Sequence, residues 1–585
     1  MNTLLEILES RLLTALSKAG IDLPVGFPVK IFAAADVRHG DYQANTAMAL
    51  AKRLKMNPRE LATQVVDALE VDDLADLEIA GPGFINFRIK SETWSQKVGQ
   101  LINDPRLGVG SVAEPQNIVV DFSAPNVAKP MHVGHIRSTI IGDSLSRICR
   151  FLGHNVTTDN HIGDWGTQFG MVIYGWKNLI DPVAIEADPL QELLRLYRAV
   201  NLLCKEEEAI KDECRDELVK LQNGDAENFA IWEKCVEVSK VGLNKIYDRL
   251  DVSFDHWLGE SYYNSELVPL VKALEAEGLA RESDGALCVF SGEELPPKQD
   301  PFKEKRDGEW SDFPMIVRKG DGAFNYATTD VATVDHRLKQ WNADKIWYVV
   351  DARQSLHFQQ LFDVSKRRGC KAKLEHISFG TILGKDGKPL KTRDGDLPQL
   401  ADVLDDAVKS ARTVLEEKSG DLPVEEKDEL AKMIGIGSVK FTELSHHRSS
   451  DYIFDLDKMV ALQGDTAPYL QYSYVRVRAI FRKLEEEVTL DADGLQITEQ
   501  GEINLARTLS KFGEVLPTVL DDLKPNILSN YLLDLAKAFH SFFEACQVLK
   551  SEGDVRKSRL VLCELTGRVL QQGLGLLGIQ VPERM

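Results

Sequence analysis

The first hundred residues combine a helical pattern with a strand-like one. The leucines nearest the N-terminus recur at helical spacing and predict an amphipathic helix: Leu4, Leu5, Leu8, Leu12, Leu13 and Leu16. Because Glu6 and Glu9 interrupt this apolar stripe, we interpret the segment as part of the fold and not as a secretory signal. A second helix is expected over residues 43–56, and an alternating strand over residues 84–88 follows a Gly-Pro-Gly turn. Together these elements predict a small α+β module over residues 1–110.

A different pattern begins near residue 117, after a stretch rich in glycine and proline that is typical of a linker. Residues 117–124 (NIVVDFSA) form a continuous apolar strand, and residues 132–153 form a helix that Gly153 is expected to end. Residues 155–162 (NVTTDNHI) then provide a second strand. A strand, a helix and a strand in this order predict a βαβ unit, which is the building block of a doubly wound parallel sheet.

The same α/β domain is expected to continue to residue 405. Two later apolar segments, residues 345–352 and 376–383, are candidates for further strands. The chain between them and the first unit is too long for a simple connection, so we expect an insertion over about residues 175–320. We interpret its acidic stretch, residues 205–218 (KEEEAIKDECRDEL), as a solvated helix face.

The remaining residues, 406–585, have helical periodicity throughout and predict an all-α domain. The fold class is therefore α/β, with a Rossmann-like doubly wound catalytic domain between an N-terminal α+β module and a C-terminal helical bundle.

Composition narrows the class of protein. The chain has 585 residues, of which 43% are hydrophobic and 28% charged, so every domain can bury an ordinary core. No apolar run approaches the roughly 18 residues of a membrane-spanning helix. The eight cysteines contain no C-x-x-C pair, which makes a disulfide framework or a zinc site improbable and suggests a reducing cytoplasm. The net charge of −21 does not favour binding to nucleic acid, which is also negatively charged. Any RNA contact must therefore depend on local basic patches.

The densest chemical signal is residues 123–139 (SAPNVAKPMHVGHIRST), between the first strand and its helix. His132 and His135 share one face of the first helical turn, and Gly134 lets a nucleotide approach the backbone. Two imidazoles beside the positive end of a helix dipole suit the stabilisation of charge on phosphorus. A chance H-x-G-H match and a zinc site are the alternatives, although no HExxH or nearby cysteine supports zinc. The Walker A and GxGxxG patterns are missing.

With its flanking residues, this segment (123–170) resembles the nucleotide site of class I aminoacyl-tRNA synthetases, and specifically that of the arginyl-tRNA synthetase family. Further segments resemble this family in the same order: residues 39–48, 81–89, 321–333, 351–362, 463–480 and 581–585. The resemblance implies an arginine–tRNA ligase of bacterial type, cytoplasmic and monomeric. It would join arginine and ATP into arginyl-adenylate with release of pyrophosphate, and then transfer arginine to tRNA(Arg). ATP would bring Mg²⁺ as a substrate complex, without a structural metal.

The resemblance also implies roles for residues around ATP. His132 and His135 would contact the α-phosphate in the transition state, beside Gly134. The second class I signature is altered in residues 384–396 (GKDGKPLKTRDGD), where alignment on Thr392 and Arg393 places Pro389 in the first lysine position. Which cation meets the pyrophosphate therefore stays open among four lysines: Lys385, Lys388 and Lys391 of this loop, and Lys129 upstream of the histidines. A solvated basic turn is the alternative.

Arginine recognition requires acceptors in the plane of a guanidinium, which carries five donors. Tyr326 and Asp330 are four residues apart, hence on one face if their segment is helical, and they resemble the family's guanidinium-binding pair. Asp121 resembles a further acidic contact. Three residues match positions that hold the α-amino and carboxylate end: Ser123, Asn126 and Gln354. The alternative for Asp330 is a helix cap. Because a pocket of satisfied hydrogen bonds already rejects analogues strongly, no editing domain is expected.

Contacts to tRNA are expected at two places. Residues 474–483 (YVRVRAIFRK) carry Tyr474, Arg476 and Arg478, which can stack on loop bases or bind phosphates, although an ordinary amphipathic helix is the alternative. Phe84 and Asn86 could be plain strand residues, but in the family this turn lies against the tRNA elbow.

Two other classes compete with this interpretation. A nucleotidylyltransferase, or a sibling synthetase such as the cysteine enzyme, would share the histidine motif, but the latter would need zinc-binding residues that are missing here. A non-catalytic RNA-binding paralogue would not be expected to retain both histidines and the acidic pocket. The sequence leaves open whether arginine activation requires bound tRNA.

Overall fold

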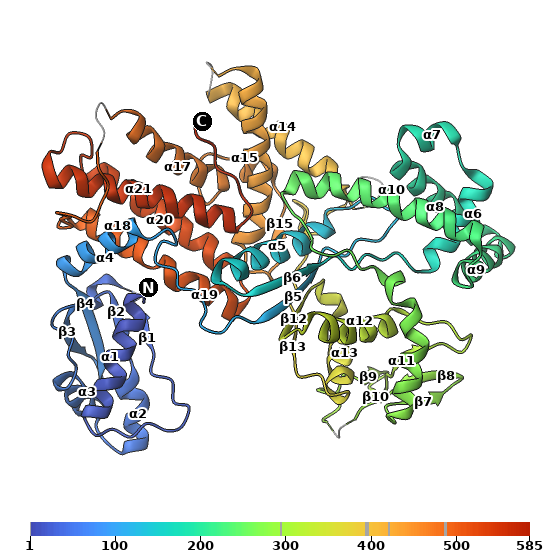
Figure 1. Cartoon of the computed structure of the whole chain (residues 1–585), viewed down its shortest axis with the longest axis horizontal. Helices are drawn as coiled ribbons and strands as arrows, with labels where there is room; N and C mark the ends of the chain where they lie inside the picture. The colour runs from blue at the N-terminus through green and yellow to red at the C-terminus, as the bar shows by residue number, and fades with distance from the viewer. Residues whose placement is uncertain (1, 35, 293–294, 392–396, 419–421, 485–487) are drawn as a thin grey trace.

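The computed structural model describes residues 2–34, 36–292, 295–391, 397–418, 422–484 and 488–585. Figure 1 shows a parallel sheet near the centre of the molecule, with the C-terminal helices on one side of it and two further lobes on the other. The N-terminal module lies beneath the C-terminal helices, so both parts lie on the same side of the sheet.

The N-terminal module is the α+β unit that the sequence predicts. The helix α1 (Leu4–Lys18) begins at a capping box, in which the Thr3 hydroxyl accepts from the Glu6 amide and the Glu6 carboxylate accepts from the Thr3 amide. Four strands form an antiparallel sheet in the order β1-β2-β4-β3. The remaining elements of the module are β1 (Ile31–Ala33), η1 (Val37–His39), β2 (Tyr42–Ala44), α2 (Thr46–Leu54), α3 (Pro58–Asp67), β3 (Ala75–Ala80), β4 (Phe84–Ile89) and α4 (Ser91–Asn103).

The central sheet is parallel, in the order β13-β12-β5-β6, which confirms the predicted doubly wound unit. Its first strand is β5 (Asn117–Phe122), followed by α5 (Gly134–Leu152) and β6 (Asn155–Asp159). Gly153 ends α5 in the left-handed conformation (φ 96°), as expected of a C-terminal glycine. The other two strands are β12 (Lys345–Val349) and β13 (Lys373–His376).

The strand predicted over residues 376–383 is wrong in extent. The chain leaves the sheet after His376, and only a two-residue strand, β14 (Ile382–Leu383), follows. The reason is that residues 378–380 form hydrogen bonds with a distant segment instead of with the sheet. The Arg448 guanidinium donates to the Ser378 carbonyl (2.5 Å), and the Gly380 amide donates to the Arg448 carbonyl (2.9 Å). β14 then pairs with β15 (Tyr452–Ile453) from the C-terminal half of the chain.

Two lobes are present where the sequence predicts one insertion. The first lies between β6 and β12 in the sequence, and the second also includes two elements that follow β12. The first is helical and has its own apolar core: α6 (Thr167–Leu179), α7 (Pro182–Ala187), α8 (Pro189–Glu206), α9 (Glu208–Gln222) and α10 (Ala226–Leu250). The predicted acidic helix is α9, of which Cys214 and Leu221 are the buried residues.

The second lobe packs small antiparallel sheets against helices over a separate core. Its elements are η2 (Glu260–Tyr263), α11 (Asn264–Ala276), β7 (Ala280–Ser283), β8 (Ala286–Val289), β9 (Lys303–Arg306), β10 (Glu309–Asp312), β11 (Met315–Arg318), α12 (Tyr326–Trp341), η3 (Ala352–Gln354) and α13 (Ser355–Arg367).

The C-terminal part is helical, as predicted, apart from β15. Its helices are α14 (Leu400–Lys418), α15 (Val424–Ser445), α16 (Leu456–Met459), α17 (Ala467–Arg482), α18 (Gln500–Ser510), α19 (Phe512–Asp522), α20 (Asn526–Ala545) and α21 (Gly553–Leu576). This part holds the N-terminal module through polar contacts as well as apolar ones. The Tyr42 hydroxyl donates to Glu514 (3.0 Å), and Arg568 donates to the Asp104 carbonyl (2.8 Å).

Two further observations bear on the class of protein. Among the helices of the described residues, none is long and apolar enough to cross a membrane. All eight cysteines are free thiols.

Candidate active site

The two segments predicted to bind ATP are joined by backbone hydrogen bonds. The Val133 amide donates to the Pro398 carbonyl (2.9 Å), and the Leu400 amide donates to the Met131 carbonyl (2.8 Å). The chain that leaves the lysine-rich loop is therefore fixed against the histidine motif at the start of α5. This contact brings together two segments about 260 residues apart in the sequence.

The loop between β5 and α5 is strained. Ser123, Ala124 and Ala128 adopt the left-handed conformation (φ 73°, 44° and 61°), which residues with a Cβ rarely do. Strain of this kind persists only where the surrounding structure enforces it, and it concentrates at functional sites. The predicted nucleotide loop therefore has the geometry expected of a binding site.

Both histidines direct one ring nitrogen to the backbone. The Nδ1 of His132 accepts from the Gly134 amide (3.1 Å), and the Nδ1 of His135 accepts from the His132 amide (3.2 Å). Their ring centroids are 4.0 Å apart. With Nδ1 serving as acceptor, the proton of neutral His132 resides on Nε2, which is then available as a donor. The Nδ1 of His135 also lies 3.3 Å from the His132 carbonyl oxygen, so the same arrangement holds for His135 only in its Nε2–H tautomer.

The two imidazoles are neutral at physiological pH. Burial, and then the charges of Lys129 and Arg353, lower the pKa of His132. Burial and the neighbouring His132 lower the pKa of His135 to about 3. Both rings can therefore donate hydrogen bonds to a phosphate oxygen, while the positive charge beside them comes from other groups.

The candidate lysines differ in their surroundings. Lys129 lies over the Tyr197 ring, with its amine 4.1 Å from the centroid, and its charge reaches His132. Lys385 is paired with Asp455 (3.2 Å) and lies 3.6 Å from Asp457. Lys388 and Lys391 are exposed and form no ion pair with any described residue. Thr392 and Arg393 of the same signature lie outside the described residues. Arg353, which the sequence analysis did not single out, is a further cation near His132.

The predicted arginine pair lies on α12. Tyr326 and Asp330 share a helical face, and the helix is capped by the Asn325 side chain, so capping is not the role of Asp330. The Asp330 carboxylate is 2.5 Å from the Nε2 of His357, and Tyr326 is 57% exposed above the same imidazole.

The charges around Asp330 keep it ionised. Burial alone would raise the pKa of Asp330, but the hydrogen bond and charge of His357 and the charge of His161 lower it. His161 lies 3.8 Å from the other oxygen of Asp330. Burial opposes the protonation of His161, yet Asp121 and Asp330 raise its pKa. An ionised carboxylate between polar rings is suited to a guanidinium.

Glu260 at the start of η2 belongs to the same cluster, although the sequence analysis did not identify it. Burial, with the carboxylates of Asp330 and Asp164 and against the charge of His161, raises the pKa of Glu260 to about 7. No sequence motif includes Glu260. This residue belongs to the second lobe, and only the fold brings it to the cluster around Asp330.

The other residues predicted to contact substrate arginine differ in how accessible their side chains are. The Ser123 hydroxyl is engaged with Thr139 (2.8 Å) and Tyr247 (2.7 Å) inside the fold, so its side chain is not free for a ligand. Asn126 and Gln354 are exposed. The Asp121 carboxylate is buried against Arg337. These placements leave Asn126 and Gln354 as the accessible members of the group predicted for the α-amino and carboxylate end.

The predicted tRNA contacts of the N-terminal module lie on β4. Phe84, its first residue, is half-buried. Asn86 is 2% exposed, and its side-chain oxygen accepts from Gln43 of β2 (2.7 Å). In this structure the Asn86 side chain is enclosed by the sheet, so it supports the surface near Phe84 and does not itself reach the solvent.

On α17, Tyr474 and Arg478 face the interior of the helical bundle. Tyr474 is 2% exposed, and its hydroxyl donates to Glu583 near the C-terminus (3.1 Å). Arg478 pairs with Glu564 of α21 (3.0 Å). The predicted stacking and phosphate contacts of these two residues are disfavoured, because neighbouring helices occupy the space that a nucleotide would need.

Two other side chains of α17 do not pack against the C-terminal segment in this way: Arg476 and the exposed Tyr472. Arg476 is half-buried, donates to His540 (3.1 Å) and lies over the Phe543 ring, with its guanidinium carbon 4.6 Å from the centroid. Tyr472 is 46% exposed. An amphipathic pattern could not distinguish these side chains from those that pack against the C-terminus.

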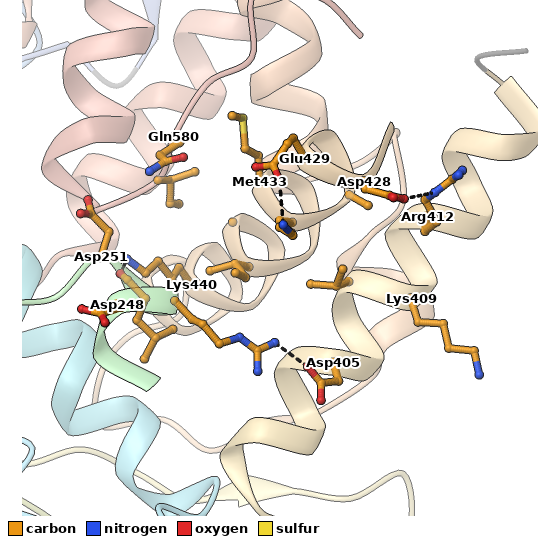
Figure 2. Close-up of a pocket in the computed structure, with 18 of the residues that line it drawn as sticks. Asp248, Asp251, Asp405, Lys409, Arg412, Asp428, Glu429, Met433, Lys440 and Gln580 are labelled. Carbon is orange, nitrogen blue, oxygen red and sulfur yellow. Dashed lines mark hydrogen bonds and ion pairs between the residues drawn. The ribbon is translucent and has the colours of Figure 1, made fainter. Parts of the chain in front are cut away.

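A cavity of about 1030 Å³ lies apart from this site, between α10, α14, α15 and the segment after α21. Figure 2 shows that charged side chains on its walls are engaged with one another, as in the pair of Arg412 with Asp428 (2.8 Å). The buried Lys440 amine donates to the carbonyls of Leu250 and Gly578 (2.7 Å to Gly578). The cavity is thus a junction between the C-terminus and the catalytic domain, and it contains none of the predicted site residues.

Comparison with family models covers most of the chain. Residues 97–456 match the model of the class I tRNA synthetase (R) catalytic domain. Residues 470–585 match the DALR anticodon binding domain, and residues 6–89 match the arginyl-tRNA synthetase N-terminal domain. The parallel sheet with its histidine motif is therefore the catalytic domain of a class I tRNA synthetase.

Curated relatives match over the full length. The chain is 44% identical to the arginine–tRNA ligase of Hahella chejuensis over 588 residues, covering 99% of each, and 44% identical to that of Laribacter hongkongensis over 592 residues, covering 100% of each. The arginyl-tRNA synthetase of Plasmodium falciparum superposes over 100% of both chains at 28% identity (TM-score 0.82). That of Thermus thermophilus shares the fold at 24% identity, also over 100% of both chains (TM-score 0.81). The chain belongs to the arginyl-tRNA synthetase family.

Proposed function

We propose that this protein is an ATP-dependent arginine–tRNA ligase that forms arginyl-adenylate and then transfers arginine to the 3′ end of tRNA(Arg). The observation that carries this proposal is the meeting of the histidine motif with the chain leaving the lysine-rich loop, within a chain that matches this family from end to end. Neither segment alone specifies the activity, since H-x-G-H motifs occur in other nucleotide-binding enzymes.

In the first step the arginine carboxylate attacks the α-phosphorus of ATP, and pyrophosphate leaves. The Nε2–H groups of His132 and His135 would donate to the oxygens on which charge develops, and Gly134 leaves room for the nucleotide. Lys129, Lys385, Lys388 and Lys391 are the candidate cations for the pyrophosphate. Among them Lys129 is best supported, because its charge already reaches His132.

The substrate guanidinium would bind the ionised Asp330, with Tyr326 beside it. Asn126 and Gln354, which are exposed, are proposed to hold the α-amino and carboxylate end. Asp121 is proposed as a further acceptor. The engaged hydroxyl of Ser123 would act by fixing the loop.

In the second step the 2′-OH of the terminal adenosine of the tRNA attacks the carbonyl carbon of arginyl-adenylate, the bond from that carbon to the phosphate oxygen breaks, and AMP leaves. The N-terminal module, through Phe84 and the strand that Asn86 stabilises, and the accessible face of α17 with Arg476 are the proposed tRNA surfaces. We assign residues 1–110, 111–405 and 406–585 to the tRNA-contact module, the catalytic domain and the anticodon-binding domain. The catalytic family model extends further, to residue 456, and thereby includes α14 and α15.

Mg²⁺ is proposed to enter as part of the ATP substrate. The described residues contain no group of three or more histidine, cysteine or acidic side chains able to hold a metal ion. The phosphate oxygens and water would therefore supply most of its ligands, which is the usual arrangement for this ion. The protein is further proposed to act as a cytoplasmic monomer.

Charging of purified tRNA tests the proposal. Incubation with ATP, total tRNA and labelled arginine is expected to label the arginine isoacceptors, identified by hybridisation to isoacceptor-specific probes. Labelled cysteine serves as the control for the sibling class. Labelling of another isoacceptor group, or of none, would contradict the proposed function.

A further inference from the structure

Arg337 is a buried guanidinium next to the proposed arginine pocket. It lies seven residues after Asp330 on α12, which places both side chains near one face of the same helix. Its exposed fraction is 0%. A fully buried arginine requires anionic partners, because an unpaired charge inside a protein is costly.

The partners of Arg337 are the carboxylates that end two neighbouring strands. Asp121 of β5 and Asp159 of β6 lie directly opposite each other in the parallel sheet. The Nη2 of Arg337 donates to the Oδ2 of Asp121 (2.7 Å) and to the Oδ2 of Asp159 (2.8 Å). One cation thus bridges two acids that would repel each other without it.

The carboxylates of Asp121 and Asp159 differ in whether one oxygen is still free to accept a hydrogen bond. The Oδ1 of Asp159 accepts from the Leu258 amide (3.2 Å), so both of its oxygens are occupied. The Oδ1 of Asp121 accepts from no residue of the described chain, and the Asp121 side chain keeps a 6% exposed fraction against 0% for Asp159. Asp121 alone therefore retains an acceptor for a ligand.

The charged surroundings of Asp121 connect it to Asp330. The titratable groups that act on Asp121 come from five elements: Arg337 of α12, Asp159 of β6, His161 after β6, Tyr348 of β12 and Tyr263 of η2. Asp121 and Asp330 both raise the pKa of His161, so the two carboxylates belong to one electrostatic cluster.

We propose that Arg337 is a positioning residue for substrate arginine: its guanidinium holds Oδ2 of Asp121 beside Asp159, so that Oδ1 can accept from the substrate guanidinium. This inference rests on the proposed function. One helix then supplies both elements of recognition, Asp330 directly and Asp121 through Arg337. Recognition of substrate arginine would then depend on the guanidinium of Arg337. It neutralises one of the two carboxylate charges and leaves Oδ1 of Asp121 free to accept from the substrate.

Removal of Arg337 has a specific chemical consequence. Burial already raises the pKa of Asp121, and the charge of Arg337 opposes this shift. Without that charge the neighbouring carboxylate of Asp159 would raise the pKa of Asp121 further, as closely spaced carboxylates do. A protonated Asp121 is a poor partner for a cation, and rising pH would restore it.

The test is the arginine KM of the full-length R337M variant, measured by pyrophosphate exchange with tRNA present from pH 6.5 to 9. We expect an increase of about 30-fold at pH 7 that shrinks as the pH rises, with the KM for ATP unchanged within about threefold. The double variant R337M/D159N removes the competing acid and is expected to recover most of the arginine KM at pH 7. An unchanged arginine KM in R337M, or equal losses in both KM values at every pH, would overturn the proposal.

Two further variants separate positioning from folding. R368M removes a less buried ion pair, between Arg368 at the end of α13 and Asp335 of α12 (2.7 Å), and is expected to leave the arginine KM unchanged. If R337M does not fold, R337K keeps the charge but loses the planar fork. We then expect a several-fold increase in arginine KM, and an unchanged KM with a lower melting temperature would refute the role. A wild-type protein without arginine-dependent exchange would instead remove the proposed function.

Discussion

His132 lies directly opposite Gln399 in a short antiparallel bridge. The histidine motif at the start of α5 and the chain that follows the lysine-rich loop are therefore held at a fixed distance. The geometry brings together two segments far apart in the sequence, as their proposed roles at one nucleotide require.

Replacement of either histidine should slow adenylate formation. His132→Ala and His135→Ala each remove an Nε2–H donor aimed at developing charge, and such donors are worth about 10²–10³ in rate. We expect a decrease of that size in kcat for arginine-dependent pyrophosphate exchange. Arginine affinity, measured by calorimetry, should stay within about twofold, and a parallel loss of arginine binding would contradict the assignment.

The lysines should contribute unequally to the same reaction. Lys129→Ala and Lys391→Ala are each expected to slow adenylate formation, since Lys129 already acts on His132 and Lys391 forms no ion pair with the described residues. Lys385→Ala should have a smaller effect, because that lysine is paired with Asp455. Exchange rates at saturating arginine measure all three. An unchanged rate would remove the role from the residue concerned.

Asp330→Asn should raise the KM for arginine sharply. Loss of one buried, charged partner typically costs at least about 2 kcal/mol, which corresponds to about 30-fold. Asp335→Asn, on the same helix but paired with Arg368, is the matched control and should leave this KM near its wild-type value. A normal arginine KM in the Asp330 variant would exclude the proposed guanidinium contact.

The arginine KM should depend on pH through Glu260. Burial raises the pKa of Glu260 to about 7, so this carboxyl is largely neutral below pH 7 and ionised above it. Substrate arginine is a cation throughout this range and favours the ionised form, so its KM should fall as the pH rises from 6 to 8. Glu260→Gln should abolish that part of the dependence. A Gln variant with the wild-type pH profile would show that another group titrates.

The N-terminal module can be tested through β4. Asn86→Ala and Phe84→Ala are expected to raise the KM for tRNA while leaving arginine binding intact, Phe84 by loss of a contact and Asn86 by loosening the strand that presents it. The melting temperature should fall only for Asn86→Ala, since only that side chain is fully enclosed. Equal losses in tRNA charging and arginine binding would refute the assignment.

Local patterns predicted much of the fold. The apolar run at the start of β5 and the glycine after α5 are encoded within a few residues, and both elements lie where the pattern places them. The overextended strand after His376 shows the limit. Its continuation is prevented by Arg448, more than 70 residues later, and no local pattern can reveal such a contact.

The candidate site was predictable to the same extent. The sequence predicts the histidine motif and the pair on α12 as site residues because each lies within one helix or its first turn. Glu260 and Arg337 escaped notice because their importance arises only when β6, η2 and α12 converge. Tyr474 shows a related limit: an aromatic residue on an amphipathic helix can face a ligand or, as here, the C-terminal segment.

The most direct test of the account is pyrophosphate exchange by the wild-type protein with each of the twenty amino acids, with and without total tRNA. We predict that arginine is the one amino acid of the twenty that supports exchange. The His132→Ala variant is expected to lose nearly all of this exchange. Exchange with a different amino acid, or arginine-dependent exchange that survives the loss of His132, would contradict the account.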